Sequence, residues 1–279
     1  MNICRKAVLT VLAVMLAAML MSFTCAASEN IGEPITLLYN DNPIEGALCV
    51  GGTAYAPYRA LISAIEPEAE FSWNQKKAAT SASGDGIVIN ASAGSNYIEA
   101  NGRILYHDTA KNLIINDTLY VPVSSLADSY SLVWSFNAER MRSCVAGSPN
   151  PILNADEFYD AESLYWLSRI ISAESRGESL RGQIAVGNVV IGRTRSTAFP
   201  NTIYGVIFDF KYGTQFTPAK TGSVYKTPTD SAVVAAKIAL EGYQIVNALY
   251  FCTIRVSNGS WIDRTRQYVD TIGNHRFYY

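Results

Sequence analysis

Histidine is scarce in this chain of 279 residues, which contains only His107 and His275. A catalytic zinc site in an amidase or peptidase normally takes two or three histidine ligands. The chain also has no H-E-x-x-H motif and no pair of closely spaced cysteines. The sequence therefore disfavours a zinc amidase or peptidase, and it indicates no metal or other cofactor.

Cysteine is also sparse, and only Cys49, Cys144 and Cys252 lie beyond the first 27 residues. Three widely spaced cysteines do not form the even, regular framework of a disulfide-rich secreted protein. Cys49 and Cys144 either pair with each other or remain buried thiols, and the second interpretation is favoured because cysteine is often a small core residue. A nucleophilic pair of Cys252 and His275 is a further alternative, without a supporting motif.

Long apolar runs are missing except at the N-terminus. Arg5 and Lys6 precede an apolar run of 15 residues, Ala7–Met21, which is short for a membrane span. Small residues end this segment, so we expect residues 1–27 to be a signal peptide cleaved before Ser28. Lipidation at Cys25 is a disfavoured alternative. No integral membrane segment is expected in the mature chain, which is predicted to be secreted to the cell wall or spore envelope.

Charge of either sign is limited, and the formal net charge is −2. Removal of Arg5 and Lys6 leaves 20 basic against 24 acidic residues, a net charge of −4. This balance gives no indication of a nucleic-acid partner. Any affinity for an anionic wall polymer must come from local sites, and the sequence leaves the oligomeric state open.

An internal repeat occupies residues 30–147. Gly52–Pro57 matches Asp117–Pro122, and Phe71–Asn74 matches Leu132–Ser135. Each copy reads as a strand ending at proline, a short helix, and a strand that carries tryptophan. Further strands are expected at Gly86–Ala91 and Asn112–Tyr120. The sequence thus predicts a small, duplicated α+β domain.

The T-x-Y-x-P…W pattern of this repeat resembles the copper amine oxidase-like N-terminal (stalk) domain. No ligand cluster for copper accompanies it. The aromatic side chains of the repeat either stack on sugars or form its core, and the core interpretation is favoured. These side chains are Tyr55, Tyr120, Trp73 and Trp134. We expect a spacer or wall-targeting role, and we expect the proline-containing residues 148–157 to form a linker.

The segment that follows places a carboxylate at the end of an apolar helical stripe. Glu174 lies seven residues after Leu167, so it points toward the side of the helix that carries the stripe. Desolvation there raises a carboxyl pKa, as a general acid requires, although a solvated charge at a helix end is the alternative. Gly177 is expected as the left-handed residue that ends the helix, before a second apolar helix with small residues at Gly182–Gly192.

These residues resemble the motifs of the SleB-type cell wall hydrolase family, the spore-cortex-lytic enzymes. The matches keep their order over about residues 160–279. They are Ala173-Glu174, Arg176-Gly177-Glu178, Gly182-Gln183, Ala185-Val186, Val189, Arg193, Phe199-Pro200, Val206-Ile207, Gln215-Phe216, Ala248–Phe251 and His275–Tyr278. In two places the chain departs from the pattern, because Gly192 replaces an asparagine and Cys252-Thr253 follows Tyr250-Phe251 where the family has Tyr-Asn.

The resemblance implies a lysozyme-like α+β catalytic domain at residues 158–279, acting on the glycan strands of peptidoglycan in spore cortex or cell wall, in sporulation or germination. It implies that Glu174 is the catalytic acid of a lytic transglycosylase. Glu178, Gln215, Tyr250 and His275 are the expected substrate contacts. Glu178 is the only further acid close in sequence, with Arg176 expected to neutralise it. A non-catalytic wall-binding or spore-structural protein on the same fold is the alternative.

Other elements of this domain follow from local signals. A short helix is expected at Ile203–Ile207, and a strand at Ala248–Phe251. A longer helix is expected to begin with Thr227 as its N-cap and Pro228 at its first position, and to end at Gly242. Gln215 is expected in a loop that lines a groove. His275 is interpreted either as a donor that supports the site or as a packed core histidine.

Overall fold

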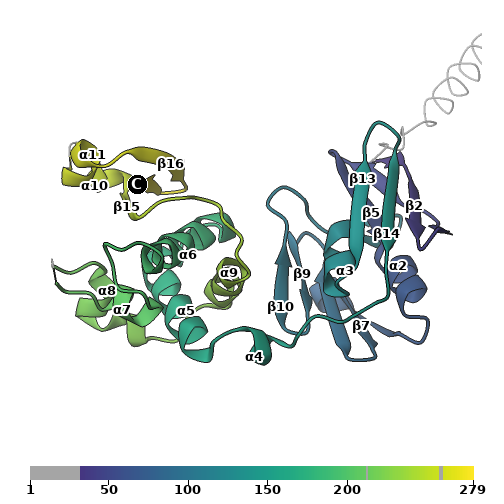
Figure 1. Ribbon diagram of the computed structural model, residues 1–279, viewed down its shortest axis with the longest axis horizontal. Helices are drawn as coiled ribbons and strands as arrows, with labels where there is room; N and C mark the ends of the chain where they lie inside the picture. The colour runs from purple at the N-terminus through teal and green to yellow at the C-terminus, as the bar shows by residue number, and fades with distance from the viewer. Residues whose placement is uncertain (1–31, 212, 258–259) are drawn as a thin grey trace, which may run out of the picture.

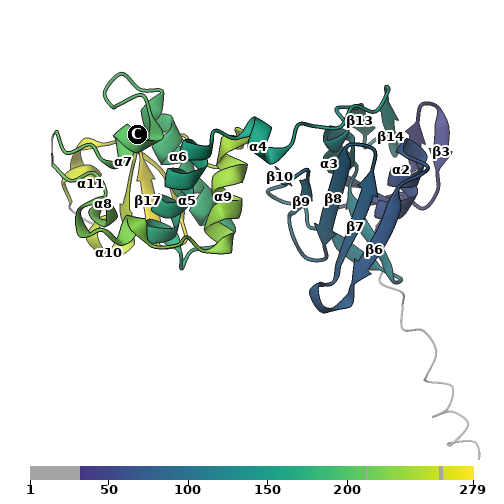
Figure 2. The same cartoon turned by 90° about the horizontal axis from the view of Figure 1, so that it is seen from below.

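The structure, a computed structural model, describes residues 32–211, 213–257 and 260–279. The predicted signal peptide, residues 1–27, lies outside this range. The chain forms two bodies, each with its own core, so the predicted α+β class is confirmed (Figures 1 and 2). After the families that they resemble in sequence, we name residues 32–147 the stalk domain and residues 158–279 the hydrolase domain. Within the described residues, no helix combines the length and apolarity that a bilayer crossing requires.

Three sheets build the stalk domain around helices α2 (Tyr58–Ile65) and α3 (Val123–Ser129). The first sheet has the order β1 (Glu33–Pro34), β4 (Leu48–Val50), β5 (Thr53–Pro57), β12 (Thr118–Pro122) and β11 (Leu113–Ile115). The second has the order β10 (Arg103–Tyr106), β9 (Tyr97–Ala100), β8 (Ile87–Ser92), β7 (Ala79–Gly84) and β6 (Glu70–Asn74). The third has the order β13 (Val133–Asn137), β14 (Arg142–Ala146), β2 (Thr36–Tyr39) and β3 (Asn42–Ile44). Strands β2 and β14 pair in parallel, and the other neighbours pair antiparallel.

Both copies of the repeat fold as strand, helix and strand: β5, α2 and β6 in the first, and β12, α3 and β13 in the second. Each helix begins directly after its proline, because the ring holds φ at −56° in Pro57 and −55° in Pro122. The copies meet at β5 and β12, where Tyr120 lies opposite Pro57 and Pro122 lies opposite Tyr55. Tyr55 is buried, as the core interpretation predicts, and its hydroxyl donates to the Lys111 carbonyl oxygen at 3.0 Å.

The prediction of one strand across Asn112–Tyr120 is wrong. The segment is a hairpin in which Asn116 and Asp117 separate β11 from β12. Both residues have positive φ, 48° and 60°, the conformation of a tight two-residue turn that asparagine and aspartate tolerate. The expected strand at Gly86–Ala91 is observed as β8.

The three cysteine thiols of the described residues are unpaired and half-buried rather than fully buried. Cys49 lies in β4 and Cys144 lies in β14, which belong to different sheets.

Helices α5 (Ala161–Ser175), α6 (Leu180–Thr194) and α9 (Asp230–Leu240) form the centre of the hydrolase domain. A Cβ added at Gly187 would lie 2.9 Å from Ile171 and 3.2 Å from Ala239, so glycine permits this close packing. Shorter helices and a three-stranded sheet surround the centre. They are α7 (Ile203–Ile207), α8 (Thr217–Thr221), η2 (Ser223–Tyr225), α10 (Ile254–Ser257), α11 (Trp261–Thr265), and the sheet β15 (Tyr250–Thr253), β17 (His275–Tyr278) and β16 (Tyr268–Ile272).

Two predicted helix boundaries need correction. Thr229, not Thr227, is the N-cap of α9, and its hydroxyl accepts from the amide of Ala232 at 3.3 Å. Helix α5 ends with Arg176 in right-handed conformation, and Gly177 is not among the residues with positive φ. The second helix instead starts afresh at Ser179, whose hydroxyl accepts from the amide of Gly182 at 3.3 Å. Gly242 does follow α9 in left-handed conformation, as predicted.

Helix α4 (Ala155–Phe158) connects the two domains and begins inside the predicted linker, where Asn154 and Glu157 form a capping box. Strand β10 of the stalk domain packs against α9 (Figure 2). Ile104 and Tyr106 of this strand are part of the apolar core of the hydrolase domain. The stalk and hydrolase domains are therefore in direct contact.

Candidate active site

Glu174 lies in the last turn of α5, next to the junction with α6. The stripe that precedes it is fully buried at Leu167, Ile170 and Ile171, as its spacing predicts. Burial raises the pKa of the Glu174 carboxyl from 4.5 to about 7, and the positive charge of Arg193 opposes this rise. The pKa of this carboxyl therefore lies close to neutral pH, where both its protonated and its ionised forms are populated. A group in this state can donate a proton and later accept one.

Arg193, near the end of α6, is the centre of the site. Its side chain is buried, with 4% exposure. Its Nε donates to the carbonyl oxygen of Leu249 at 2.7 Å, and its Nη1 donates to Oε1 of Gln215 at 3.4 Å. Burial lowers its pKa to about 10, although the charges of Tyr250, Asp209 and Glu174 act in the opposite direction. The arginine thus remains charged at neutral pH and lies close enough to Glu174 to stabilise its anion.

Three aromatic rings surround the guanidinium. Its carbon lies 4.8 Å from the ring centre of Phe199, 5.0 Å from that of Phe216 and 5.5 Å from that of Tyr250. Such distances allow favourable cation–π contacts, which are stronger where the cation is desolvated. Motif fragments from four separate segments of the sequence therefore converge on one side chain.

Two of the predicted substrate contacts, Gln215 and Tyr250, belong to this cluster. Gln215 is half-buried in the loop before α8, with its carbonyl oxygen toward Arg193. The amide nitrogen of Gln215 makes no hydrogen bond within the described residues, so a donor is available. Tyr250 is half-buried in β15, between Arg193 and the guanidinium of Arg266, whose carbon lies 4.6 Å from its ring centre.

Glu178 and His275 form a separate cluster beside the hairpin of β16 and β17. The carboxylate of Glu178 accepts from the backbone amide of Asn274 at 3.1 Å and from its side-chain amide at 3.0 Å. Nδ1 of His275 lies 4.0 Å from Oε1 of Glu178. No ion pair joins Glu178 to Arg176 among the described residues, contrary to expectation. The geometry shows Glu178 holding the hairpin turn.

His275 is a packed histidine, with 4% exposure and the Phe251 ring against its edge. Burial lowers its pKa, and the negative charge of Glu178 opposes the shift. Its Nδ1 is buried without a hydrogen-bond partner within the described residues. The core interpretation of His275 thus fits the geometry, and the ring supports the sheet beside the site.

The alternative of a Cys252–His275 nucleophilic pair is wrong. Cys252 lies opposite Arg276, whereas His275 lies opposite Thr253, so the two side chains project from opposite faces of the sheet. Burial also raises the pKa of the Cys252 thiol, which disfavours the reactive thiolate. Within the part of the chain that the structure describes, no three His, Cys, Asp or Glu side chains gather in an arrangement that could hold a metal ion.

Two residues of importance were missed from the sequence. Asp209 follows α7, and its charge acts on Arg193, which places a second carboxylate near the guanidinium that Glu174 faces. Asn188 donates to the Tyr243 carbonyl oxygen at 2.8 Å and accepts from the Ile245 amide at 2.7 Å, and so fixes the loop after α9. A polar residue inside an otherwise apolar helix was the available signal for Asn188.

The glycine that departs from the family pattern has a packing explanation. A Cβ added at Gly192 would lie 3.3 Å from the carbonyl oxygen of Ala248 and 3.6 Å from Leu249. Glycine therefore lets α6 approach the segment whose next carbonyl oxygen, that of Leu249, accepts from Arg193. The departure at Cys252-Thr253 falls in β15 and leaves the pairing with β17 intact.

Comparison with known proteins agrees with these observations. Residues 177–278 match the model of the family described as Cell Wall Hydrolase, and residues 40–141 match the Copper amine oxidase N-terminal domain. Together with the relatives described below, these matches show that the chain belongs to the cell wall hydrolase family through its C-terminal domain, behind a copper amine oxidase-type stalk domain. Both predicted resemblances are confirmed. The first match begins three residues after Glu174, so the role of Glu174 depends on the site itself.

Relatives of this domain are spore cortex-lytic enzymes. That of Bacillus cereus is 35% identical over 125 residues, which cover 44% of this chain and 47% of the relative. The enzyme of Oceanobacillus iheyensis is 33% identical over 128 residues, which cover 46% of this chain and 45% of the relative. The chain thus spans about half the length of the curated relatives it matches. The solved catalytic domain of the germination-specific lytic transglycosylase SleB from Bacillus anthracis is 33% identical to this chain. The match covers that domain completely and 46% of this chain, with a TM-score of 0.40.

Proposed function

We propose that the chain is a secreted enzyme that cleaves the glycan strands of peptidoglycan at the β-1,4 bond between N-acetylmuramic acid and N-acetylglucosamine. The observation that carries this proposal is the half-buried carboxyl of Glu174 at the α5–α6 junction, where desolvation raises its pKa to about 7. A glycosidase needs such a carboxylic acid to protonate the leaving oxygen. Membership of the cell wall hydrolase family and the spore cortex-lytic relatives support the substrate class.

The reaction proposed is that of a lytic transglycosylase. Glu174 gives its proton to the glycosidic oxygen as the bond from that oxygen to the anomeric carbon of the muramic residue breaks. The 6-hydroxyl of the same muramic residue then bonds to the anomeric carbon, and its proton passes to Glu174. This sequence regenerates the acid, consumes no water and leaves a 1,6-anhydromuramic end. One carboxyl group is sufficient for both steps.

The residues around Arg193 have supporting roles in this proposal. Arg193 limits the rise of the Glu174 pKa, so that the group can act as a base after it has acted as an acid. The free amide of Gln215 suits an acetamido oxygen of the glycan, and the half-buried Tyr250 suits a sugar face. Asp209, whose charge acts on Arg193, is the candidate for the second carboxylate that a hydrolytic route would require, since Glu178 is held by Asn274.

The experiment is mass spectrometry of muropeptides released by residues 28–279 from purified cortex and from vegetative sacculi, with Glu174→Gln as the control. We expect 1,6-anhydromuramic ends that depend on Glu174, and the preferred sacculus identifies the spore envelope or the cell wall as the site of action. Reducing ends would contradict transglycosylation and direct attention to Asp209. Equal release by Glu174→Gln would contradict the assignment of the acid.

The same experiment tests the alternative of a non-catalytic wall-binding or spore-structural protein. That alternative predicts sedimentation with sacculi and no release of muropeptides from either substrate. The departure at Gly192, which could have indicated a lost activity, is explained by the close approach of Ala248.

A further inference from the structure

The two tryptophans of the stalk repeat are not core residues. Trp73 is 52% exposed and Trp134 is 42% exposed, so the core interpretation is wrong for both. Trp134 is fixed, because its indole N–H donates to Oδ1 of Asp128 at 3.0 Å. The indole N–H of Trp73 has no protein acceptor among the described residues. The repeat therefore presents one anchored tryptophan and one available tryptophan.

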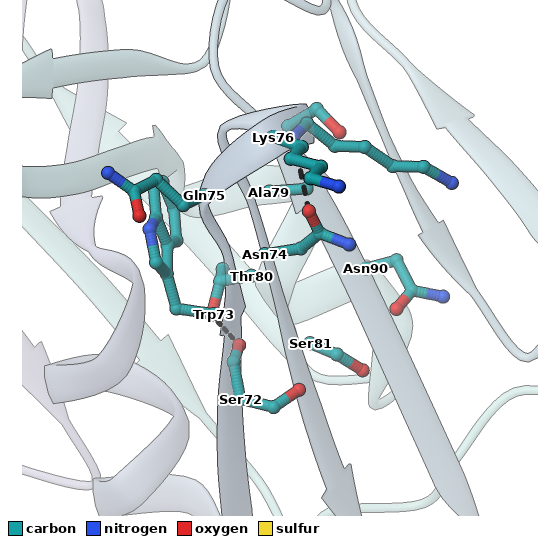
Figure 3. Close-up of a pocket in the computed structure, with 11 residues that line it drawn as sticks. Ser72, Trp73, Asn74, Gln75, Lys76, Ala79, Thr80, Ser81 and Asn90 are labelled. Atoms are coloured by element: carbon teal, nitrogen blue, oxygen red, sulfur yellow. Dashed lines mark hydrogen bonds between the residues drawn. The ribbon is translucent and has the colours of Figure 1, made fainter.

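Trp73 stands between two hollows. The first, of about 490 Å³, lies between the second sheet and β11–β12, and Arg59, Asp117 and Thr118 are among its lining residues. The second, of about 800 Å³, lies over β6–β8 and is lined mainly by hydroxyl, amide and ammonium groups (Figure 3). Trp73 and Thr80 line both hollows. Figure 3 shows the Trp73 ring on one side of β6 and the Asn74 side chain on the other.

The polar hollow has a regular arrangement. Ser72, Ser81 and Asn90 are cross-strand neighbours on β6, β7 and β8, so their side chains form a row on one face of the sheet. Lys76 and Lys77 follow in the exposed turn η1 (Gln75–Lys77). The row of hydroxyl and amide groups thus lies on one face of the sheet, and the Trp73 ring projects from the other face. Because β6 is an edge strand, the ring, the polar row and the two lysines still line one hollow around this edge.

This chemistry matches a glycan that carries acidic peptides. The apolar face of a pyranose packs on an indole, while its hydroxyl and acetamido groups need donors and acceptors of the serine and asparagine type. The two lysines suit the carboxylates of stem peptides, although the mature chain is net negative. Ala79 is the one aliphatic residue among those that line the polar hollow, which disfavours a docked apolar helix or peptide there.

We propose that the Trp73 surface of the stalk domain is a second binding site for peptidoglycan glycan strands, separate from the site around Glu174. This inference rests on the proposed function for the identity of the polymer. The stalk domain contacts the hydrolase domain through β10 and α9, so a strand held at Trp73 stays near the hydrolase domain. Binding at two linked sites raises the effective concentration of the polymer at the second site.

The test uses sedimentation of residues 28–279 with purified sacculi, in a Glu174→Gln background so that the polymer is not degraded. We expect Trp73→Ala to weaken binding on the order of tenfold, Trp73→Phe to restore part of it, and the matched control Trp134→Ala to have little effect. Lys76→Ala/Lys77→Ala is expected to make the remaining binding less sensitive to salt. Circular dichroism verifies the fold of each variant.

Competition then identifies the ligand. We expect a hexamer of N-acetylglucosamine to displace the protein from sacculi and to quench the fluorescence of Trp73. The Trp73 contribution is the difference in fluorescence between the parent protein and Trp73→Phe. Unchanged sacculus binding by Trp73→Ala, equal loss in Trp134→Ala, or displacement by free stem peptide alone would each overturn the proposal. Activity of the parent protein on short soluble glycan fragments, with an intact Glu174, reports separately on the proposed function, and Trp134→Ala is expected to retain this activity.

Discussion

Arg103 of the stalk domain and Glu241 at the end of α9 form a two-point ion pair between the domains, with N–O distances of 2.9 and 2.6 Å. Both side chains are largely buried, with 13% and 12% exposure. The hydroxyl of Tyr159 donates to the same carboxylate at 2.5 Å, and the ring of Phe158 covers the guanidinium at 3.4 Å. A short segment of β10 is thus fixed to the hydrolase domain by charge, hydrogen bonding and ring stacking at once.

Replacement of Glu241 by alanine is expected to uncouple the two domains. The change leaves the Arg103 charge buried without its partner, which costs about 3 kcal/mol. Calorimetry should show two separate unfolding transitions in place of one, with the hydrolase domain unfolding at the lower temperature. Glu139→Ala, at an exposed position of the stalk domain, is the control and should leave the transition unchanged. A single, unshifted transition in Glu241→Ala would contradict this role.

Replacement of Glu174 by glutamine is expected to stabilise the protein at high pH. The folded pKa of about 7 exceeds the ordinary value of 4.5, so the folded state holds a proton that the unfolded state has lost between these values. The free energy of unfolding of the parent protein therefore falls as pH rises from about 4.5 to 7, by on the order of 2 kcal/mol.

The Glu174→Gln variant cannot ionise at this position, so its free energy of unfolding does not fall with pH for this reason. Urea unfolding at pH 5 and pH 8 measures the difference, and the variant should gain stability relative to the parent only at pH 8. A constant difference between the two pH values would mean that Glu174 titrates normally in the folded protein.

The pH dependence of activity is also expected to follow the titration of the Glu174 carboxyl. Glu174 must be protonated to act as the acid, so kcat/KM is expected to fall tenfold per pH unit above about 7. Initial rates on soluble glycan fragments between pH 5 and 9 provide the measurement. A descending limb near pH 5 would show that the carboxyl is not desolvated when the enzyme acts.

Glu178→Gln is expected to reduce stability rather than catalysis. Glutamine keeps one acceptor for Asn274, but its amide group cannot accept the second hydrogen bond, so about 1 kcal/mol is lost at the turn between β16 and β17. The melting temperature should fall, while kcat/KM below the melting transition stays within about twofold of the parent value. Glu162→Gln, at an exposed position, controls for the change in charge. The opposite result, unchanged melting with lost activity, would return Glu178 to the site as a catalytic group.

Local sequence patterns predicted those structural features that depend on residues close together in the sequence. The spacing of Leu167, Ile170 and Ile171 located the buried side of α5 and the isolation of Glu174. The repeat around Pro57 and Pro122 predicted strand, helix and strand in each copy. In both cases the structure depends on a period or a backbone restriction that the sequence displays directly.

Convergence of distant segments was not predictable in the same way. Arg193 meets Gln215 across 22 residues and Leu249 across 56, and no periodicity connects these positions. Thr227 and Thr229 flank the same proline, so local rules did not distinguish the true N-cap. The exposure of Trp73 depends on how the stalk sheets pack, which residue type alone does not determine.

The parallel pairing of β2 with β14 has a mechanical consequence. Thr36, where β2 begins, lies opposite Arg142, and both strands then run in the same direction toward Val145. Tension applied between the start of β2 and the end of β14 therefore pulls the two strands lengthwise past each other. All the hydrogen bonds between them resist at once, whereas a hairpin pulled from its open end loses its bonds one after another. Tension between these two ends thus loads the third sheet of the stalk domain in shear.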